Sequence, residues 1–275
     1  MKSQVCIYPY RIPPYCKNIV ITGGSRGVGK SLARAFLKQG DSVFLTSRNV
    51  HVLREAVYDL ELYAPRDRIH YMPGDISNLE HCKDVAKKAL ATMGSIDIWI
   101  NNAGTNGFMT KPYDQYDKDE ITSVIDTNIY GTIYGSQVMI DVMKKQKNGL
   151  LVNVEGAGSN GFSTPNHALY GMTKQAITHF TKTLMYENIN APFNICTISP
   201  GMVLTDMLLS DESNYSLKSV FNIICEEPDY IGEFLVKRIN NVSRHEQIRY
   251  LTILRIVWLC VLGLFRKNRH FDESL

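Results

Sequence analysis

Tyr170 and Lys174 have the spacing at which two side chains share one face of a helix. A tyrosine hydroxyl normally titrates near pH 10, so its pKa must be tuned toward neutrality before it can transfer protons efficiently. A lysine one helical turn away supplies a positive charge that favours the phenolate. The pair could therefore exchange a proton with a carbonyl or alcohol oxygen. Because Tyr and Lys recur at this spacing by chance, the interpretation needs support from the rest of the chain.

A glycine-rich turn lies between an apolar run at 19–21 and an amphipathic pattern at 32–37. Gly23, Gly27 and Gly29 follow the spacing TGxxxGxG. Missing side chains let the backbone approach a pyrophosphate, and the following helix offers N–H groups and a partial positive charge. The alternative is a tight connection without a ligand. The strand before the turn and the helix after it favour a dinucleotide site.

The residues after the second apolar run indicate which nicotinamide cofactor is bound. That run ends in Thr46-Ser47-Arg48, where no carboxylate is present to bind a free ribose hydroxyl. A guanidinium makes paired, charge-assisted hydrogen bonds to phosphate, and Arg26 in the glycine-rich turn could reach the same group. The sequence therefore predicts NADP(H). The alternative is that Arg26 and Arg48 are solvated surface residues.

Strand and helix patterns alternate along most of the chain, which predicts a parallel sheet because parallel neighbours need a crossover. The expected fold is α/β, a single doubly wound, Rossmann-like domain over 17–245 with helices on both faces of the sheet. The expected strands are 19–21, 42–46, 69–72, 96–100, 150–154 and 193–198, and the expected helices include 52–62, 79–93, 120–146 and 170–188.

Composition excludes some classes of function. The chain has 275 residues, 44% hydrophobic and 21% charged, and its net charge of +3 is too small to indicate nucleic acid binding. The N-terminal residues 1–17 have no signal-peptide core and no transit-peptide character, so we expect a cytoplasmic location. We expect no metal site and no disulfide, because no CxxC pair or metal spacing joins Cys6, Cys16, Cys82, Cys196, Cys225 and Cys260.

Three further motifs stand in a fixed order around the element Tyr170-Gly171-Met172-Thr173-Lys174: Asn101-Asn102-Ala103-Gly104 and Thr127-Asn128-Ile129-Tyr130-Gly131 before it, and Ser199-Pro200-Gly201 after it. Together with the glycine-rich turn, this set resembles the short-chain dehydrogenase/reductase family. The resemblance implies that Asn128, Tyr170 and Lys174 are catalytic, that Lys174 also binds the nicotinamide ribose, and that Asn128 holds a water.

The resemblance and the turn together give an expected NADP-binding set. Its members are Gly23, Ser25, Arg26, Gly27, Val28, Gly29, Ser47, Arg48, Asp75, Ile76, Asn102, Ala103, Gly104, Tyr170, Lys174, Pro200, Gly201, Val203 and Thr205.

One position departs from the family pattern. The family usually carries a substrate-polarising serine thirteen residues before the tyrosine, and this chain has Ala157 there. Ser159, with Ser163 behind it, is the expected replacement as the fourth catalytic residue, because its hydroxyl could donate to the developing oxyanion. The alternative is that Ser159 only satisfies a backbone turn.

The departure points to a subfamily. The stretches 96–106, 156–159, 163–165, 199–210 and 221–226 resemble the chlorophyll b reductases. That resemblance implies that NADPH reduces a formyl group on a chlorophyll-like ring, although the lack of a transit peptide argues against a plastid enzyme. Two alternatives remain: a steroid, retinoid or sphingoid-base reductase, and a catalytically idle, NADP-binding regulatory protein.

The C-terminal segment, 246–275, contains an apolar run at 248–265 that Arg249 and Arg255 interrupt. A membrane span is disfavoured by these charges. The run is expected either to lie peripherally at a membrane interface or to pack as a core or dimer helix. A homodimer or homotetramer is implied by the family resemblance only, and the expected partner is a small apolar carbonyl substrate.

Overall fold

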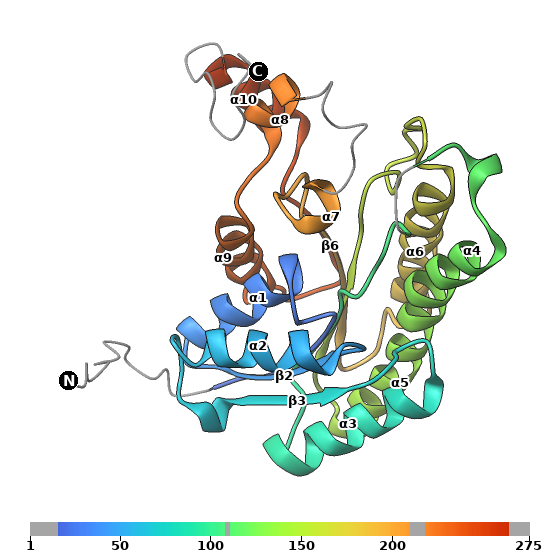
Figure 1. Cartoon of the computed structure of the whole chain (residues 1–275). Helices are drawn as coiled ribbons and strands as arrows, with labels where there is room; N and C mark the ends of the chain where they lie inside the picture. The colour runs from blue at the N-terminus through green and yellow to red at the C-terminus, as the bar shows by residue number, and fades with distance from the viewer. Residues whose placement is uncertain (1–15, 108–110, 210–217, 264–275) are drawn as a thin grey trace.

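The computed structural model describes residues 16–107, 111–209 and 218–263. In this part of the chain, drawn in colour in Figure 1, the central element is a parallel sheet. It has seven strands in the order β3-β2-β1-β4-β5-β6-β7. The expected doubly wound α/β fold is confirmed. The strands are β1 (Asn18–Thr22), β2 (Ser42–Ser47), β3 (Ile69–Pro73), β4 (Ile98–Asn101), β5 (Leu150–Val154), β6 (Asn194–Ser199) and β7 (Glu246–Arg249).

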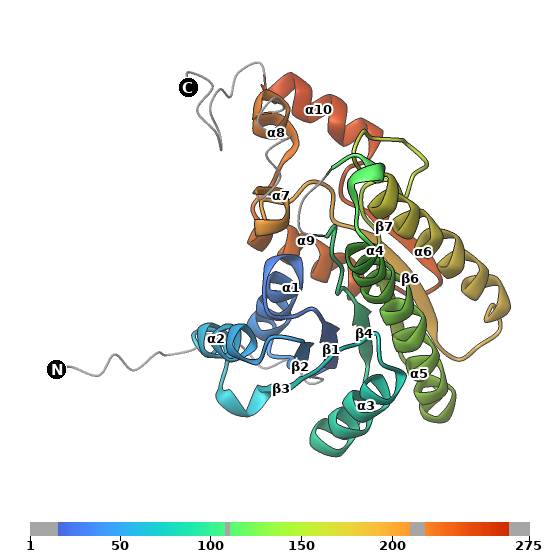
Figure 2. The same cartoon turned by 45° about the vertical axis from the view of Figure 1, so that its right-hand side comes forward.

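Helices cover both faces of the sheet, with α1 and α2 on one side and α3 and α5 on the other (Figure 2). The longer helices are α1 (Gly27–Lys38), α2 (Val50–Leu60), α3 (Leu79–Met93), α4 (Lys118–Ile125), α5 (Gly131–Gln146), α6 (Ala168–Glu187), α9 (Pro228–Ile239) and α10 (Ile253–Gly263). Shorter helical turns are η1 (Arg66–Arg68), η2 (Tyr113–Gln115), α7 (Asp206–Leu209) and α8 (Lys218–Ile224).

Apolar side chains on both faces of each central strand explain the two helical layers. In β1, Ile19 and Ile21 join the core beneath α1, α2 and α9, whereas Val20 joins the core beneath α3 and α5. Successive side chains of a strand point to opposite faces. The apolar middle of such a strand must therefore be covered on both faces, as in parallel sheets generally.

The connections reverse direction between β1 and β4, which pair in parallel at the centre of the sheet. In open α/β sheets, ligands bind in the crevice outside the carboxyl ends of the strands at such a switch point. The loops after β1 and β4 meet there: a Cβ atom at Gly23 would lie only 2.7 Å from the Ala103 Cα.

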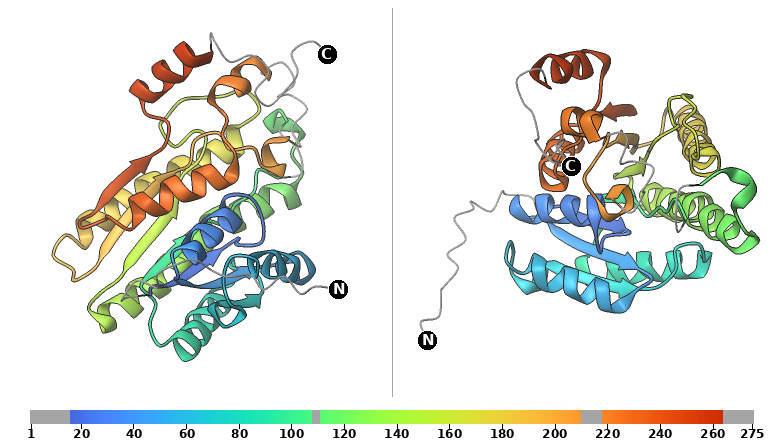
Figure 3. Two further views of the ribbon diagram at one scale, coloured as in Figure 1. Left: turned by 90° about the vertical axis from the view of Figure 1, so that its left-hand side faces the viewer. Right: turned by 45° about the horizontal axis from the view of Figure 1, so that its top comes forward.

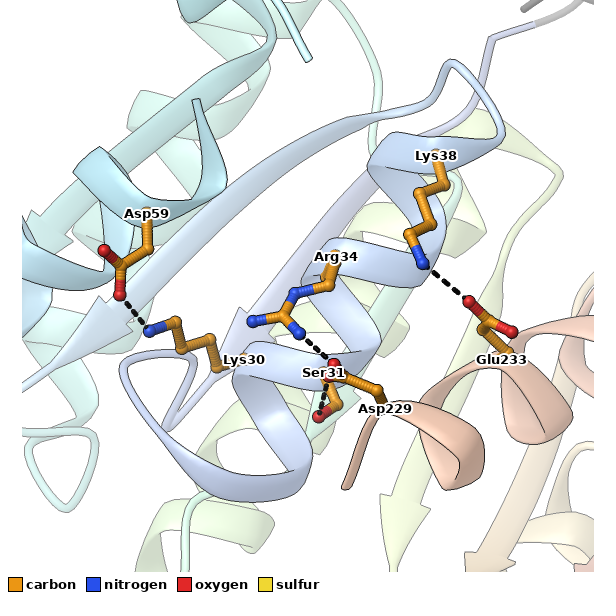
Figure 4. Close-up of polar contacts among 7 residues, drawn as sticks. All are labelled: Lys30, Ser31, Arg34, Lys38, Asp59, Asp229 and Glu233. Carbon is orange, nitrogen blue, oxygen red and sulfur yellow. Dashed lines mark hydrogen bonds and ion pairs between the residues drawn. The ribbon is translucent and has the colours of Figure 1, made fainter. Parts of the chain in front are cut away.

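Helix α1, which begins at the glycine-rich turn, is held from two sides (Figure 4). Lys30 pairs with Asp59 of α2 at 2.5 Å, and Arg34 pairs with Asp229 of α9. A Cβ atom at Gly232 would lie 2.6 Å from the Ser31 carbonyl oxygen, so α9 packs directly against the α1 backbone. These contacts fix the helix whose N-terminus faces the proposed cofactor site.

The helix expected over 120–146 is divided in the structure. Helix α4 leads into a π-helical turn, η3 (Asp126–Tyr130), which leads into α5 without a break. Such turns are rare and occur frequently at functional sites. This one contains Asn128, whose side chain is fully buried.

The C-terminal region differs from the expected boundary at 245. Residues 246–249 form β7, which pairs with β6 at the edge of the same sheet. Helix α10 then packs beside α8 beyond the end of the sheet (Figure 3). The range 248–265 is therefore not one segment, and residues 264–275 lie outside the described part.

Most apolar side chains of α10 are exposed within the described part of the chain, and one is buried. Leu254 is 84% and Trp258 is 55% exposed, whereas Leu259 is 4% exposed. Both arginines that interrupt the apolar run 248–265 have structural positions of their own. Arg249 is the last residue of β7. The Arg255 guanidinium stacks 3.8 Å from the Tyr250 ring centroid. No helix in the described ranges is long and apolar enough to cross a membrane.

Cysteines in the described ranges are free thiols: Cys16, Cys82, Cys196, Cys225 and Cys260. Cys6 lies outside those ranges. The same described residues contain no cluster of three or more His, Cys, Asp or Glu side chains suited to a metal ion.

Candidate active site

The glycine-rich turn forms a cradle of bare backbone between β1 and α1. Gly23 and Gly27 have positive φ angles of 64° and 53°, which side chains other than glycine rarely adopt. A Cβ atom at Gly29 would clash with the Gly23 carbonyl oxygen and the Asn102 Nδ2 atom. No side chain caps the N-terminus of α1, so its N–H groups remain available for an anion.

The loop after β4 is bonded to this turn. The Asn102 amide donates to the carbonyl oxygens of Thr22 and Gly23 at 2.9 and 3.1 Å. In return, the Thr22 Oγ1 atom accepts from the N–H groups of Asn102 and Ala103, both at 3.1 Å. Thr22 was not among the expected site residues, although its place directly before Gly23 marks it in the sequence.

Arg26 and Arg48, which the sequence assigns to a ribose phosphate, are both exposed. Neither guanidinium has an ion-pair or hydrogen-bond partner among the described residues. Ser47, another residue of the expected NADP-binding set, makes a local hydrogen bond. Its hydroxyl donates to the Asn49 carbonyl at 3.5 Å. Both guanidinium groups are therefore available to pair with the phosphate of a ligand.

Loops after β3 and β6 complete the same edge of the sheet. The Asp75 carboxylate accepts from the Ser77 N–H and hydroxyl, both at 2.9 Å. Ile76 is buried and packs against Gly131, where a Cβ atom would clash with it. Across the crevice, a Cβ atom at Gly27 would lie 3.2 Å from the Thr205 Cγ2 atom.

The segment after β6 is itself fastened to the fold. Gly201 has a φ of 77°, and Val203 forms an isolated bridge with Glu226. Leu204 N–H donates to the Glu226 carbonyl at 3.0 Å. The expected residues Pro200, Gly201, Val203 and Thr205 thus lie on one loop that closes over the end of the sheet.

Tyr170 and Lys174 lie at the N-terminal end of α6 beside the first residues after β5. The Lys174 Nζ atom donates to the Val154 carbonyl at 3.2 Å and lies 5.6 Å from the Tyr170 ring centroid. A Cβ atom at Gly156 would clash with the Tyr170 hydroxyl, and one at Gly104 would lie 3.3 Å from Nζ. The pair therefore meets the loops of both β4 and β5.

Asn128 connects these loops. Its Oδ1 accepts from the Thr105 N–H at 2.8 Å, and its Nδ2 donates to the Thr105 carbonyl at 2.9 Å and to Thr173 Oγ1 at 3.0 Å. The side chain thus fixes the β4 loop to α6, while its backbone carbonyl accepts from the Thr132 hydroxyl at 2.8 Å. Thr105 and Thr173 were missed because only the folded chain brings them to Asn128.

The expected donor Ser159 lies in a tight turn against α6. Ser159 is buried, whereas Ala157 and Ser163 are exposed. Gly158 has a φ of 91°, and a Cβ atom there would lie 2.6 Å from the Gly171 Cα. Within the described residues the Ser159 hydroxyl has no hydrogen-bond partner, so the structure leaves its role as a donor a prediction.

Residues 17–216 match the family described as short chain dehydrogenase. The chain belongs to the short-chain dehydrogenase family. The description of this family names a dehydrogenase, which is a class of oxidoreductase.

Among relatives of this short-chain dehydrogenase, the rice protein named "Probable chlorophyll(ide) b reductase NYC1, chloroplastic" is 38% identical over 94% of the chain. The alignment spans 54% of that relative, and 56% of the Arabidopsis thaliana protein of the same name, so the chain covers about half of their length. The rice protein named "Chlorophyll(ide) b reductase NOL, chloroplastic" is 35% identical over 96% of the chain and 80% of its own length.

Solved structures show the same fold. An alcohol dehydrogenase from Thermococcus sibiricus complexed with 5-hydroxy-NADP aligns with a TM-score of 0.72 at 24% identity, over 87% of this chain and 97% of the other. A 3-ketoacyl-(acyl-carrier-protein) reductase from Brucella melitensis complexed with NADH aligns with a TM-score of 0.75 at 22% identity, over 85% and 96%.

Electrostatics in this short-chain dehydrogenase differ from the sequence expectation for the tyrosine. Burial raises the pKa of Tyr170 to about 12, because the phenolate loses its hydration, and does not move it toward neutrality. Burial also lowers the pKa of Lys174 to about 8, although the negative charge of Glu155 opposes this effect. The tyrosine is therefore held in its protonated form, which is the form that can donate to a carbonyl oxygen.

Proposed function

We propose that this chain is an NADPH-dependent reductase that transfers a hydride to the carbonyl group of a bulky apolar substrate, with a chlorophyll-like formyl group as the leading candidate. The observation that carries the proposal is the meeting of Tyr170 and Lys174 with Gly104 and Gly156 at the carboxyl end of the sheet. The protonated Tyr170 phenol can donate a proton to the carbonyl oxygen of a substrate as that oxygen gains negative charge. The buried Lys174 ammonium can stabilise the charge.

The choice of NADPH rests on the fit of the chain to that cofactor. The cradle at Gly23 and Gly29 excludes side chains, and the N-terminus of α1 is uncapped, as a pyrophosphate requires. Arg26 and Arg48 are exposed cations without partners in the described ranges, and a guanidinium matches a ribose phosphate. A carboxylate that would favour NADH does not follow β2.

When bound, NADPH supplies the hydride that adds to the carbonyl carbon. Tyr170 donates its hydroxyl proton to the carbonyl oxygen, so the product is an alcohol and the phenolate is later reprotonated from solvent. Lys174 stabilises that phenolate by its positive charge. Asn128 keeps the β4 loop and α6 together, and α6 carries Tyr170 and Lys174.

The substrate class rests on the relatives and on the surface near the site. The NYC1 and NOL proteins are named chlorophyll(ide) b reductases. Their similarity extends over 94% to 96% of this chain. The segments that follow β6 expose apolar side chains, among them Met207, Leu209 and Val220. An apolar ring system would cover such residues, and so would a steroid, a retinoid or a sphingoid base.

Purified protein incubated with NADPH or NADH and a panel of chlorophyll b, a retinal, a ketosteroid, a 3-ketosphingoid base and small aldehydes tests the proposal. We expect NADPH oxidation with chlorophyll b and the formation of the hydroxymethyl product. Turnover with another carbonyl only would replace the substrate class. No turnover with any compound, together with tight NADPH binding, would contradict the reductase.

A catalytically idle NADP-binding protein is the second candidate, and Ala157 favours it. Ala157 is exposed at the position where the family usually has its polarising serine. Unless Ser159 replaces that group, Tyr170 is the main donor to the carbonyl oxygen. The substrate panel separates the two candidates, since an idle protein binds NADPH and turns nothing over.

Location and assembly follow as predictions. The NYC1 and NOL relatives are named as chloroplastic proteins. The compartment of this chain is a question for localisation experiments on the full-length protein. The exposed apolar side chains of α10 fit either a peripheral membrane contact or a subunit contact. We expect a homodimer or homotetramer. The apparent mass of the protein, measured with and without lipid vesicles, distinguishes a subunit contact through α10 from a membrane contact.

A further inference from the structure

Glu155 is a buried carboxylate at the active site to which none of the motifs above assigns a role. It is the first residue after β5 and its side chain is 0% exposed. Glutamate is almost never fully buried unless it is paired. A charge removed from water at this place therefore calls for a reason beyond packing.

The partners of Glu155 satisfy one carboxylate oxygen and leave the other open. Oε1 accepts from the Thr178 hydroxyl at 3.2 Å and from the Gln247 side-chain amide at 2.6 Å. Oε2 is buried, has no hydrogen-bond partner among the described residues and lies 3.9 Å from the Arg249 Nε atom. Gln247 and Arg249 both belong to β7, so the last strand of the sheet supplies a contact to each oxygen of this carboxylate.

Glu155 and Lys174 lie in the same narrow layer between β5 and α6. The Lys174 Nζ atom donates to the carbonyl of Val154, the residue directly before Glu155. Thr178 follows Lys174 by one helical turn, and its single hydroxyl proton lies within hydrogen-bond distance of two acceptors, the Lys174 carbonyl at 3.0 Å and the Glu155 carboxylate at 3.2 Å. One threonine thus ties the glutamate to the helical turn that presents the lysine.

We propose that Glu155 is a positioning residue whose buried carboxylate keeps the Lys174 ammonium charged beside Tyr170, and that Arg249 of β7 sets the strength of this effect. The inference deepens the proposed reductase function and rests on it for its catalytic meaning. It also gives residues 246–249 a part in the active site.

The charged surroundings of Lys174 agree with this assignment. Burial lowers the pKa of Lys174 to about 8, and the charge of Glu155 is what raises it against that effect. Tyr170 is neutral because burial raises its pKa to about 12. On β6 the Cys196 thiol is also neutral, since burial raises its pKa. Arg249 is the cation that faces the open oxygen of Glu155.

The first test replaces the charge and keeps the shape. In Glu155→Gln we expect the high-pH limb of kcat for carbonyl reduction to move down by about one pH unit or more, the usual range for loss of a close opposite charge. Glu155→Asp keeps the charge and should return the limb toward that of the wild type. Glu120→Gln, at another buried carboxylate that caps α4, should lower stability and leave the limb in place.

A second readout needs no turnover. In protein labelled with 15N-lysine, the Lys174 Nζ signal, assigned by its loss in Lys174→Arg, reports the titration of that amine directly. Its midpoint should fall in Glu155→Gln and stay constant in Glu120→Gln. Arg249→Gln, at a side chain that is 39% exposed, should raise the midpoint, because the carboxylate then acts on Lys174 without a competing cation.

Opposite movements in Glu155→Gln and Arg249→Gln support the inference, even if no carbonyl is turned over, in which case only the proposed function fails. An unchanged Lys174 midpoint in both variants overturns it, whatever the activity. Should Glu155→Gln not fold, Arg249→Gln alone decides, since a midpoint equal to that of the wild type contradicts the coupling.

Discussion

The two sides of the active site are built differently. On the cofactor side, the loops after β1 and β4 are joined by four hydrogen bonds between Asn102, Ala103, Thr22 and Gly23, and their backbones leave no room for side chains. On the substrate side, the segments after β5 and β6 expose large apolar side chains, including Phe162 at 77% and Leu209 at 54%.

This difference indicates which structural features determine the specificity for each ligand. A backbone cradle is suited to one unvarying group, the dinucleotide, and any added atom disturbs it. A surface of exposed apolar side chains can change its shape by substitution without disturbing the sheet. The fold and the residues on the cofactor side therefore indicate the class of reaction. They do not identify the substrate, which must be found by experiment.

The largest binding effect is expected on the cofactor side. Arg26→Ala combined with Arg48→Ala should weaken NADPH binding by about 2–5 kcal/mol, the range for truncating one partner of a hydrogen-bonded charge pair, and spare NADH. Fluorescence titration with both cofactors measures this. Arg54→Ala, an exposed arginine on α2, is the control. Equal losses for NADPH and NADH would show that the pair holds the pyrophosphate or the fold.

On the substrate side, Ser159→Ala should lower turnover by roughly a hundredfold, as loss of one oxyanion donor usually does, with little change in KM. Ser163→Ala is the matched control, because Ser163 is exposed and should contribute little. Steady-state kinetics of both variants decide the point. Two enzymes close to wild type would leave Tyr170 as the only donor and give Ser159 a purely structural role.

Glycines on the two sides should respond differently to one added methyl group. Gly29→Ala places a Cβ atom against Gly23 and Asn102, so we expect a loss of about 1–3 kcal/mol in the free energy of unfolding and loss of NADPH binding. At Gly161 a Cβ atom meets nothing within 4 Å, although φ is 84°, so Gly161→Ala should cost less and leave NADPH binding intact. Urea unfolding and cofactor titration compare the two. Comparable losses of NADPH binding would mean that the cradle is not specific to the cofactor side.

The smallest effect is expected on α10. Leu254→Ala should change the free energy of unfolding by less than about 0.5 kcal/mol, because the side chain is 84% exposed. Leu259→Ala removes the buried contact of the same helix and should increase amide hydrogen exchange throughout α10. Exchange measured by mass spectrometry tests both. Equal protection in the two variants would show that α10 is held by Arg255 and Tyr250 alone.

Much of the fold could be predicted because its signals are local. The apolar runs at β1, β2, β4 and β5 and the glycine spacing before α1 are each readable within a few residues. Strand β7 gave no such signal: its sequence, Glu246-Gln247-Ile248-Arg249, contains one buried apolar side chain between polar ones. It forms because β6 offers an edge to pair with.

The site was predictable in its residue types and less so in its electrostatics. Tyr170, Lys174 and Asn128 stand in recognisable motifs, and the structure brings all three together. The direction of the Tyr170 pKa depends on burial by distant segments, which spacing along a helix cannot give. The surroundings of Glu155 depend on β7, about ninety residues away in the sequence, so its role could not be read before the fold.

Turnover by the Tyr170→Phe variant tests the central claim most directly. The substitution removes the transferable proton and little packing volume, so we predict that carbonyl reduction is lost while NADPH binds within a few-fold of wild type. Both are measured on one preparation, by NADPH oxidation with any accepted carbonyl and by fluorescence titration of the cofactor. Turnover comparable to that of the wild type would contradict the assignment of Tyr170 as the proton donor.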